Sequence, residues 1–507
     1  MTCSKNTKFS FPLIINGVAL NFAKRIIVIT FIFLAGMFHL SANEPACRTT
    51  SFLEGVKQPG NHVTIERNDI GMILEKTDDK EKGKGVRLLS LIDRYTSTVL
   101  SANESLPLFS VELLDKTTGE TVSIHSEDGW KKVEVDRKAE QFVFSGASLP
   151  EGEKLCVVLE ILAGQPGTGN GLDWHWQVRK SVDRYEFRKL NCPQLSLRNL
   201  GTTMKVFYPY ASGVVRENPC DKKTNWQATY PNGWSCSMQW TAIYDETKNT
   251  GFYVAMHDPF GSVKDIQLDA ASDTNSVTIR FIHPLPLDDT ECYAELSGVA
   301  AWRIFHGDWY DAALIYRQWV QKEAQWYPRQ KLGPNGRTDT PQWMKELCVW
   351  ALDSYLGDSL QTALQKTPEK MKKFTGALGI PAGLHLYNWH QVPFDNDYPH
   401  YFPVKDGFGE AVAEIQKNGD CYVMPYINGR LWDTRDKGME DFQFTSIALP
   451  AATKKEDGTP YTEIYGSKET DDSQVELAVM CPSISGPGSG LCRSLWWYSS
   501  IIRQKLW

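Results

Sequence analysis

The chain has 507 residues, of which 42% are hydrophobic, and its formal net charge is -7. This length allows two or three domains with substantial cores, and the hydrophobic fraction is ordinary for a globular protein. The charge is small for the length, and no basic block with interleaved aromatic residues occurs, so nucleic acid is not an expected partner. The 17 tryptophans fit either a large aromatic core or flat faces on which sugar rings stack.

Residues 1–42 have the features of a signal peptide. Lys24 and Arg25 precede an apolar run over residues 26–40, and the small residues at 41–42 offer a cleavage site. The run is short for a membrane span, so we expect no stable span in the mature chain. We predict an exported protein, periplasmic or extracellular. The residues before Cys47 are a poor lipidation context, which argues against a lipoprotein anchor.

The 11 cysteines are scattered and form no CxxC pair, so the sequence does not indicate a zinc site. Export would permit disulfides. Cys220 and Cys236 could close a loop between them, or both could be free buried thiols, and the sequence leaves both alternatives open.

Residues 43–300 have the pattern of a β domain. Short runs rich in Val, Ile, Phe and Tyr alternate with turn signals such as Thr118-Gly119, without helical patterns between them. Many strands without intervening helices predict a large antiparallel β-sandwich. We expect strands at residues 71–76, 86–92, 109–114, 142–145, 155–161, 185–187, 251–256 and 276–282.

Two stretches of this domain are both aromatic and polar, LDWHW at 172–176 and YPNGWSCSMQW at 230–240. Trp174 and Trp176 are two residues apart, so a strand would place both rings on one face as core. Alternatively, these stretches form a loop edge that stacks against a ligand. His257-Asp258 ends a strand and is either a polar contact at such an edge or a surface turn.

Residues 301–340 are expected to hold a bridging helix and a linker. Apolar residues recur at helical spacing over 309–326, and Asp308 is a plausible N-cap. Residues 328–341 are rich in Gly, Pro, Asn and Arg, which is typical of a linker.

Residues 341–507 alternate between strand and helix patterns. Apolar strands are expected at 347–352, 382–387, 422–427 and 475–480, with helices at 359–374 and 408–417. Such alternation predicts parallel strands. The whole chain therefore has the pattern of a multidomain β then α/β protein, in which an incomplete (β/α) TIM-type barrel of about four units follows the β-sandwich.

Polar and aromatic residues follow the ends of these strands. The carboxyl ends of parallel strands share one face, so we expect these side chains to lie together. Their mixture of planar donors, carboxylates and Trp faces suits sugar recognition. The candidate substrate-binding residues are His385, Asn388, Trp389, His390, Asn428, Arg430, Trp432 and Asp433. The candidate carboxylates are Asp353 and Asp433, which we assign to substrate binding rather than to acid and nucleophile roles.

Each candidate has a structural alternative. His385 could be a core histidine, Arg430 and Asp433 could pair with each other, and Asp353 could cap the next helix. Other chemistries have less support, because no GxSxG elbow and no P-loop occurs. His385 and His390 lack an obvious third ligand. We expect neither a metal nor a cofactor.

The segments YPNGW…MQW, GFYVAMHD, VMPYINGRLWD and LAVMCPS resemble those of an uncharacterised secreted bacterial family. Its members carry a domain of unknown function and are regarded as glycoside-hydrolase-like. The resemblance covers about residues 60–483. More distantly, the chain resembles retaining α-glycosidases that place a β-supersandwich before a (β/α)8 barrel. The resemblance implies carbohydrate hydrolysis at the barrel mouth.

The sequence departs from the resembling families near its end. Their catalytic carboxylates lie on strand four and beyond, in motifs such as DG-x-x-x-D, and no such motif follows Cys481. The atypical tail, residues 486–507, contains no Asp or Glu. We therefore expect a truncated and catalytically impaired glycoside-hydrolase-like protein that acts on oligo- or polysaccharide. The alternative is a non-catalytic carbohydrate-binding or surface scaffold protein.

Overall fold

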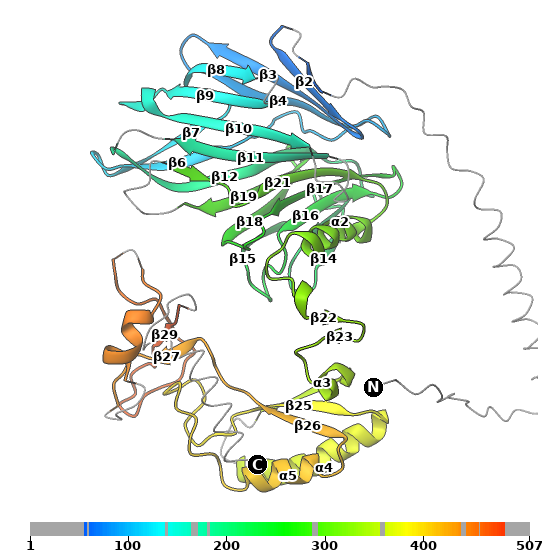
Figure 1. Cartoon of the computed structure of the whole chain (residues 1–507), viewed down its shortest axis with the longest axis vertical. Helices are drawn as coiled ribbons and strands as arrows, with labels where there is room; N and C mark the ends of the chain where they lie inside the picture. Colours follow the sequence, from blue (N-terminus) through cyan, green and yellow to red (C-terminus); the bar gives the residue numbers. More distant parts are fainter. Residues whose placement is uncertain are drawn as a thin grey trace, which may run out of the picture. The chain divides into compact units, whose positions relative to one another are not determined.

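The computed structural model describes residues 55–57, 60–136, 140–163, 171–179, 183–285, 293–354, 360–437, 443–455 and 457–481. The expected signal peptide, Cys47 and the tail 486–507 lie outside these ranges. The chain divides into two units, Met1–Tyr327 and Pro328–Trp507 (Figure 1). None of the helices in the described ranges combines the length and the hydropathy that a membrane span requires.

The first unit contains a large sheet in which all neighbouring strands are antiparallel. Its main path runs β1-β2-β3-β4-β8-β9-β10-β11-β21-β17-β16-β13-β14, and β5 and β20 pair with β4 and β11. The strands are β1 (Gly55–Lys57), β2 (His62–Arg67), β3 (Ile70–Asp79), β4 (Gly83–Asp93), β5 (Thr98–Val99), β8 (Trp130–Asp136), β9 (Gln141–Ala147), β10 (Cys156–Ala163), β11 (Gly171–Arg179), β13 (Lys205–Tyr208), β14 (Val214–Glu217), β16 (Trp240–Asp245), β17 (Thr250–His257), β20 (Tyr293–Glu295) and β21 (Val299–Phe305).

A smaller antiparallel sheet has the order β15-β18-β19-β12-β6-β7. Its strands are β6 (Ser110–Asp115), β7 (Glu120–His125), β12 (Tyr185–Arg198), β15 (Asn225–Tyr230), β18 (Lys264–Ala271) and β19 (Ser276–Pro284). Each of the eight strands expected from the sequence overlaps an observed strand, namely β3, β4, β6, β9, β10, β12, β17 or β19.

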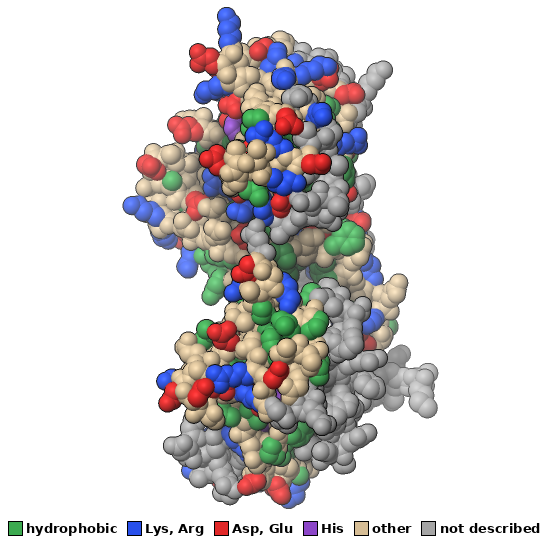
Figure 2. All heavy atoms as spheres, turned by 90° about the vertical axis from the view of Figure 1, so that its left-hand side faces the viewer, with side chains coloured by type: hydrophobic (Ala, Val, Ile, Leu, Met, Phe, Trp, Pro, Cys, Tyr) green, Lys and Arg blue, Asp and Glu red, His purple; other side chains and the backbone are tan. Residues whose placement is uncertain are grey.

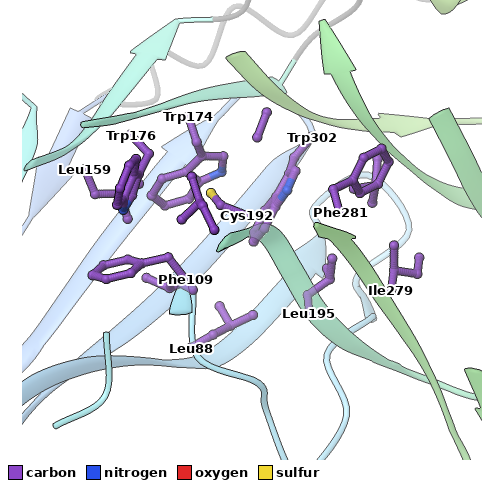
Figure 3. Close-up of a cluster of buried hydrophobic side chains, with 14 of the residues drawn as sticks. Leu88, Phe109, Leu159, Trp174, Trp176, Cys192, Leu195, Ile279, Phe281 and Trp302 are labelled. Atoms are coloured by element: carbon purple, nitrogen blue, oxygen red, sulfur yellow. The ribbon is translucent and has the colours of Figure 1, made fainter. Parts of the chain in front are cut away.

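The two sheets share one apolar core, which makes this unit the expected β-sandwich. Trp174 and Trp302 of the large sheet lie near Leu195 and Phe281 of the small sheet (Figure 3). Trp174 is 2% exposed and Trp176 is fully buried. The core interpretation of the LDWHW stretch is therefore confirmed, and its rings do not form a ligand-stacking edge.

Helix α2 (Trp309–Lys322) covers part of the outer face of the large sheet. Asp308 is its N-cap, as predicted, and its carboxylate accepts a hydrogen bond from the Tyr310 backbone N–H at 2.7 Å. Asp311 completes a capping box by accepting from the Asp308 N–H at 2.9 Å. Trp319 packs with Tyr253 and other aromatic residues beneath the helix. This helix buries β16 and β17 on their second face.

The expected position of His257 and Asp258 at a ligand edge or in a surface turn is wrong, because both residues are buried. The His257 ring stacks on Trp319 with centroids 4.7 Å apart, and its Nε2 lies 2.9 Å from the Tyr253 hydroxyl. The Asp258 carboxylate lies 3.1 Å from Lys264 Nζ, and both side chains are at most 1% exposed. Helix α2, which comes later in the chain, packs over the end of β17 through Trp319. A local sequence pattern cannot reveal this contact.

The cysteines at 220 and 236 are buried free thiols, which selects the second of the two alternatives. Burial raises the pKa of Cys236 to about 12, so this thiol stays protonated and unreactive at neutral pH.

The second unit contains a three-stranded parallel sheet in the order β24-β25-β26. Its strands are β24 (Trp350–Ser354), β25 (Ala382–Tyr387) and β26 (Cys421–Pro425), connected by α4 (Leu360–Leu378) and α5 (Phe408–Gln416). Short elements precede it: a 3-10 turn (Arg329–Lys331), the hairpin of β22 (Leu332–Gly333) and β23 (Gly336–Arg337), and α3 (Gln342–Glu346). Three of the four predicted βα strands are therefore parallel neighbours.

The fourth predicted strand, residues 475–480, is not part of this sheet. It forms β29 (Leu477–Val479), which pairs antiparallel with β27 (Leu431–Asp433) and β28 (Thr462–Glu463). A parallel connection normally needs a crossover helix. Between β26 and β29, the only helical elements of the described chain are a π-helical turn (Phe444–Ala448) and a 3-10 turn (Leu449–Ala451). An apolar run predicts a strand but not its partner.

The surface carries mixed charge. On the face shown in Figure 2, Lys and Arg side chains lie interspersed with Asp and Glu side chains.

The Asp173–Arg303 pair is buried in the first unit. Arg303 Nη2 lies 2.5 Å from Asp173 Oδ1, and the two side chains are 0% and 2% exposed. Because Asp173→Ala would leave a buried guanidinium without this partner, we expect it to destabilise the first unit by about 3–5 kcal/mol. Thermal unfolding should show the loss. The control is Glu134→Ala, which breaks the exposed pair with Lys132 and should change stability by less than about 1 kcal/mol. Equal effects of the two substitutions would contradict the prediction.

Candidate functional site

The two faces of β25 have different surroundings. Leu384 and Leu386 are buried against α4 and α5, in a cluster that includes Met371 and Phe408. The alternating residues His385 and Tyr387 are partly exposed. Since side chains alternate along a strand, these two project from the face opposite the helices. Parallel pairing therefore puts a histidine and a tyrosine on the face of the sheet that the helices leave open.

An aromatic group lies at the carboxyl end of this sheet. The Tyr387 and Tyr426 rings are stacked, with centroids 4.3 Å apart and planes at 12°. Phe394 lies 5.8 Å from Tyr387 and 5.7 Å from Tyr426. We call Tyr387, Phe394 and Tyr426 the aromatic wall. It brings together the ends of β25 and β26 and the loop after β25.

His385 lies beside the aromatic wall. Its ring is 4.8 Å from that of Tyr387 and 5.9 Å from that of Tyr426. Its side chain is partly exposed, so it is not the fully buried core histidine of the alternative interpretation. Partial burial lowers the pKa of His385, which favours a neutral imidazole that can both donate and accept hydrogen bonds.

Asp395 is a carboxylate at this edge that the sequence analysis did not select. It follows Phe394 in the loop after β25 and has a positive φ of 55°. The Tyr398 hydroxyl donates to its Oδ1 at 3.1 Å. Burial raises the pKa of Asp395. The pKa of Tyr426 is also raised, mainly by burial of Tyr426 itself and next by the charge of Asp395. Asp395 lies eight residues beyond the strand end, where the strand-end rule does not apply. The acidic loop FDND was the available signal.

Three predicted site residues, Asn388, Trp389 and His390, support the edge from within. Trp389 is fully buried, and its Nε1 donates to the Tyr426 carbonyl at 2.7 Å. This burial leaves no face of Trp389 for a sugar ring, which corrects the predicted role. Asn388 accepts from Lys405 Nζ through its carbonyl at 2.8 Å and its Oδ1 at 3.2 Å.

His390 is also fully buried. Its Nδ1 lies 2.6 Å from the Val392 carbonyl, so the ring donates there. Burial lowers the pKa of His390 to about 4. These contacts make His390 part of the packing of the loop and remove it from direct ligand contact.

Trp432 and Asp433 are likewise buried, which corrects their predicted roles. Trp432 is 2% exposed and packs with Phe444 and Met480. Asp433 Oδ2 accepts from Lys437 Nζ at 2.8 Å and from the Asp397 N–H at 3.0 Å. Its Oδ1 accepts from the Arg435 N–H at 2.9 Å. Both carboxylate oxygens are therefore occupied by the protein.

Arg430 does not pair with Asp433. It makes two hydrogen bonds to the Glu463 carboxylate, at 2.7 and 2.6 Å, and one to the Tyr465 hydroxyl at 2.8 Å. The Arg430 side chain is 53% exposed. Asn428 is partly exposed, and its Oδ1 accepts from the Arg430 and Leu431 N–H groups. Asn428 Nδ2 lies 3.4 Å from the Tyr426 hydroxyl. These two residues remain near solvent.

Asp353 is placed by its backbone alone. It lies near the end of β24, with its Cα opposite that of Leu386. Its side chain lies outside the described part of the chain. In the ranges that are described, no group of three or more His, Cys, Asp or Glu side chains is arranged to hold a metal ion.

The burial of His390 predicts acid sensitivity. The pKa of His390 falls from 6.5 to about 4 on folding, so the unfolded chain binds more protons below pH 6.5. The contribution of neutral His390 to the free energy of unfolding is complete above pH 6.5 and is lost as the pH falls from 6.5 to 4. We expect His390→Gln to flatten this part of the pH dependence of the melting temperature. His62→Gln, at a half-exposed side chain, should leave it unchanged. Parallel curves for all three proteins would disprove this role.

Comparison with known proteins identifies relatives of the chain. Residues 294–486 match the model of DUF6259, a domain of unknown function. A protein of Monosiga brevicollis named "Putative glycoside hydrolase 22789" is 25% identical over 410 residues, which cover 73% of this chain and 32% of that protein. A Bacteroides thetaiotaomicron protein named "Putative glycoside hydrolase" is 35% identical over 177 residues, covering 34% of this chain and 23% of that protein.

Among solved structures, the α-N-acetylgalactosaminidase NagBb of Bifidobacterium bifidum in complex with GalNAc has a TM-score of 0.59 at 12% identity. The match covers 86% of this chain and 68% of that one, and at this identity it shows a shared fold. The chain spans less than a third of the length of the two curated relatives. Residues 294–486 are therefore similar to the DUF6259 domain, and the chain is similar to proteins named as putative glycoside hydrolases.

Proposed function

We propose that the chain forms part of an exported glycoside hydrolase that acts on oligo- or polysaccharide. The relatives named as glycoside hydrolases and the fold shared with a glycosidase support the class of activity. The features of residues 1–42 support export. The proposed sugar-binding edge is the carboxyl end of the β24–β25–β26 sheet, where parallel α/β folds place their sites.

The aromatic wall is the observation that carries the proposal. Tyr387 and Tyr426 are stacked 4.3 Å apart, and Phe394 lies against both rings. Sugar rings have apolar C–H faces that pack against aromatic rings, while their hydroxyls need convergent polar groups. His385 and Asp395 supply such groups beside the wall. A neutral imidazole and a carboxyl with a raised pKa can each exchange hydrogen bonds with a hydroxyl pair.

The predicted binding residues divide into two roles in this proposal. His385, Asn428 and Arg430 keep exposed surface and contact substrate. Asn388, Trp389, His390, Trp432 and Asp433 are buried and hold the edge in place. A site of this kind needs buried groups behind the groups that contact the ligand, since loosely held contacts lose affinity.

Removing the Tyr387 ring tests the binding edge. We expect Tyr387→Ala to weaken saccharide binding roughly tenfold, because the stacking surface is lost. Tyr387→Phe keeps the ring and should retain most of the affinity. Affinity electrophoresis in gels cast with soluble polysaccharides measures the effect. The control is Tyr461→Ala, which removes another exposed tyrosine of the same unit. Equal retardation of Tyr387→Ala and the native chain would refute this binding edge.

Non-catalytic saccharide binding is the second candidate function, and the state of Asp433 favours it. A glycosidase uses two carboxylates flanking the scissile bond, and Asp433 is held by Lys437 and two backbone N–H groups. We therefore expect the 507-residue chain to bind saccharide without hydrolysing it.

Release of 4-nitrophenol from a panel of aryl α- and β-glycosides tests this expectation. No release above a heat-denatured sample, together with polysaccharide retardation, would support binding without turnover. Release that Asp433→Asn leaves intact would assign hydrolysis to other carboxylates and exclude the non-catalytic candidate.

A further inference from the structure

A polar cavity lies at one end of the β-sandwich, within the first unit and separate from the edge described above. Its volume is about 480 Å³, which is within the range of small-molecule sites. Its walls come from both sheets: the turn into β5, the end of β12, the turn before β17 and the turn before β19. The cavity therefore forms only when the two sheets are packed together.

Two cations line this cavity without a carboxylate among the lining residues. Arg198 and Lys248 contribute to the walls, and none of the described residues that line the cavity is Asp or Glu. Lys248 Nζ donates to the Leu200 carbonyl, which leaves two of its three protons for another acceptor. For Arg198, the described chain contains no side-chain ion pair. A concave surface lined by two cations and no carboxylate favours an anion.

Asn199 and Asn275, two of the polar residues of the walls, pair with each other through their side-chain amides. Asn199 Nδ2 donates to Asn275 Oδ1 at 2.8 Å, and Asn199 Oδ1 accepts from the Gly201 N–H at 3.0 Å. This pairing satisfies the oxygen of Asn275 and leaves its Nδ2 group available. Asn103 adds a further exposed side-chain amide. Amides beside a guanidinium and an ammonium can bind hydroxyls around a single charged group.

The walls are held in place by buried carboxylates behind them. Asp93 is fully buried, and it accepts from the Tyr95 N–H at 2.9 Å and from the Thr250 hydroxyl at 2.6 Å. It thereby connects the turn into β5 with the start of β17. Asp245 is also fully buried, and it accepts from the Thr247 N–H at 2.9 Å and the Thr203 hydroxyl at 2.8 Å. Preformed walls reduce the ordering cost of binding.

We propose that this cavity is a second binding site, which takes a saccharide bearing an oxyanion, such as the carboxylate of a uronic acid. Arg198 and Lys248 bind the oxyanion, and the amides of Asn103 and Asn275 bind hydroxyls. The cavity volume exceeds what a bare inorganic oxyanion fills, which favours a sugar-sized ligand. The proposal does not depend on the aromatic wall or on catalysis.

Isothermal titration of the full chain with D-glucuronate and D-glucose tests the proposal, because these two probes differ at C6, a carboxylate in one and a hydroxymethyl in the other. We expect glucuronate to bind at least roughly tenfold more tightly than glucose, since a charge-assisted hydrogen bond is the main difference. Its affinity should fall as NaCl is raised. Inorganic sulfate, the third probe, should bind more weakly than glucuronate.

Substitution of the cations assigns any binding to this cavity. Arg198→Gln and Lys248→Gln should each weaken glucuronate binding by roughly tenfold. Both side chains are exposed, and unchanged melting temperatures would show that the variants fold. Lys131→Gln, at an exposed lysine of β8, is the control. Tyr387→Ala should leave this binding intact, which separates it from the proposed function.

Four outcomes would overturn the proposal. Equal affinities for glucose and glucuronate would exclude recognition of an oxyanion. Sulfate binding as tight as that of glucuronate would exclude recognition of a sugar. Glucuronate binding that survives both Arg198→Gln and Lys248→Gln would place the site elsewhere, and the absence of binding by any probe would exclude the site.

Discussion

Parallel pairing of β24, β25 and β26, with helices packed on one face, determines which side chains of β25 face the helices. The pairing sets Leu386 opposite Asp353 on one side and Pro425 on the other. With the helices packed on Leu384 and Leu386, the alternation of the strand leaves His385 and Tyr387 on the open face. A shift of one residue in the pairing would exchange these two sets. The aromatic wall is therefore a product of strand register as much as of residue type.

The local patterns of the sequence predicted which segments form strands and helices better than they predicted which of these segments pack or pair together. The sandwich strands, α2 with its Asp308 cap and three parallel strands follow from periodicity and capping, which act within a few residues. The placement of residues 475–480 does not, because an antiparallel strand and a parallel one share the same apolar pattern. Likewise, His257 was not recognised as buried, since the helix that covers it begins about fifty residues later.

The binding edge remains a proposal, and burial divides the residues predicted for it into exposed and buried sets. The strand-end rule selected His385, whose ring lies 4.8 Å from that of Tyr387 at the end of β25. It could not separate Trp389, whose indole is turned inward to the Tyr426 carbonyl, from a ring that faces solvent. Whether a tryptophan stacks on a ligand or on the core depends on what surrounds it, and the sequence of a single strand contains no such information. Asp395 was missed because loop geometry, not periodicity, places it.

Strand β17 is buried on both faces, against α2 on one side and the sandwich core on the other, which limits how its backbone can open. Strand β17 pairs with β16 on one side and β21 on the other, and all eight of its residues are buried. Its amide protons can meet solvent only when the surrounding layers separate together. The same backbone leads directly into the buried Asp258–Lys264 pair. In hydrogen-exchange terms, this strand belongs to the slowest-opening part of the sandwich.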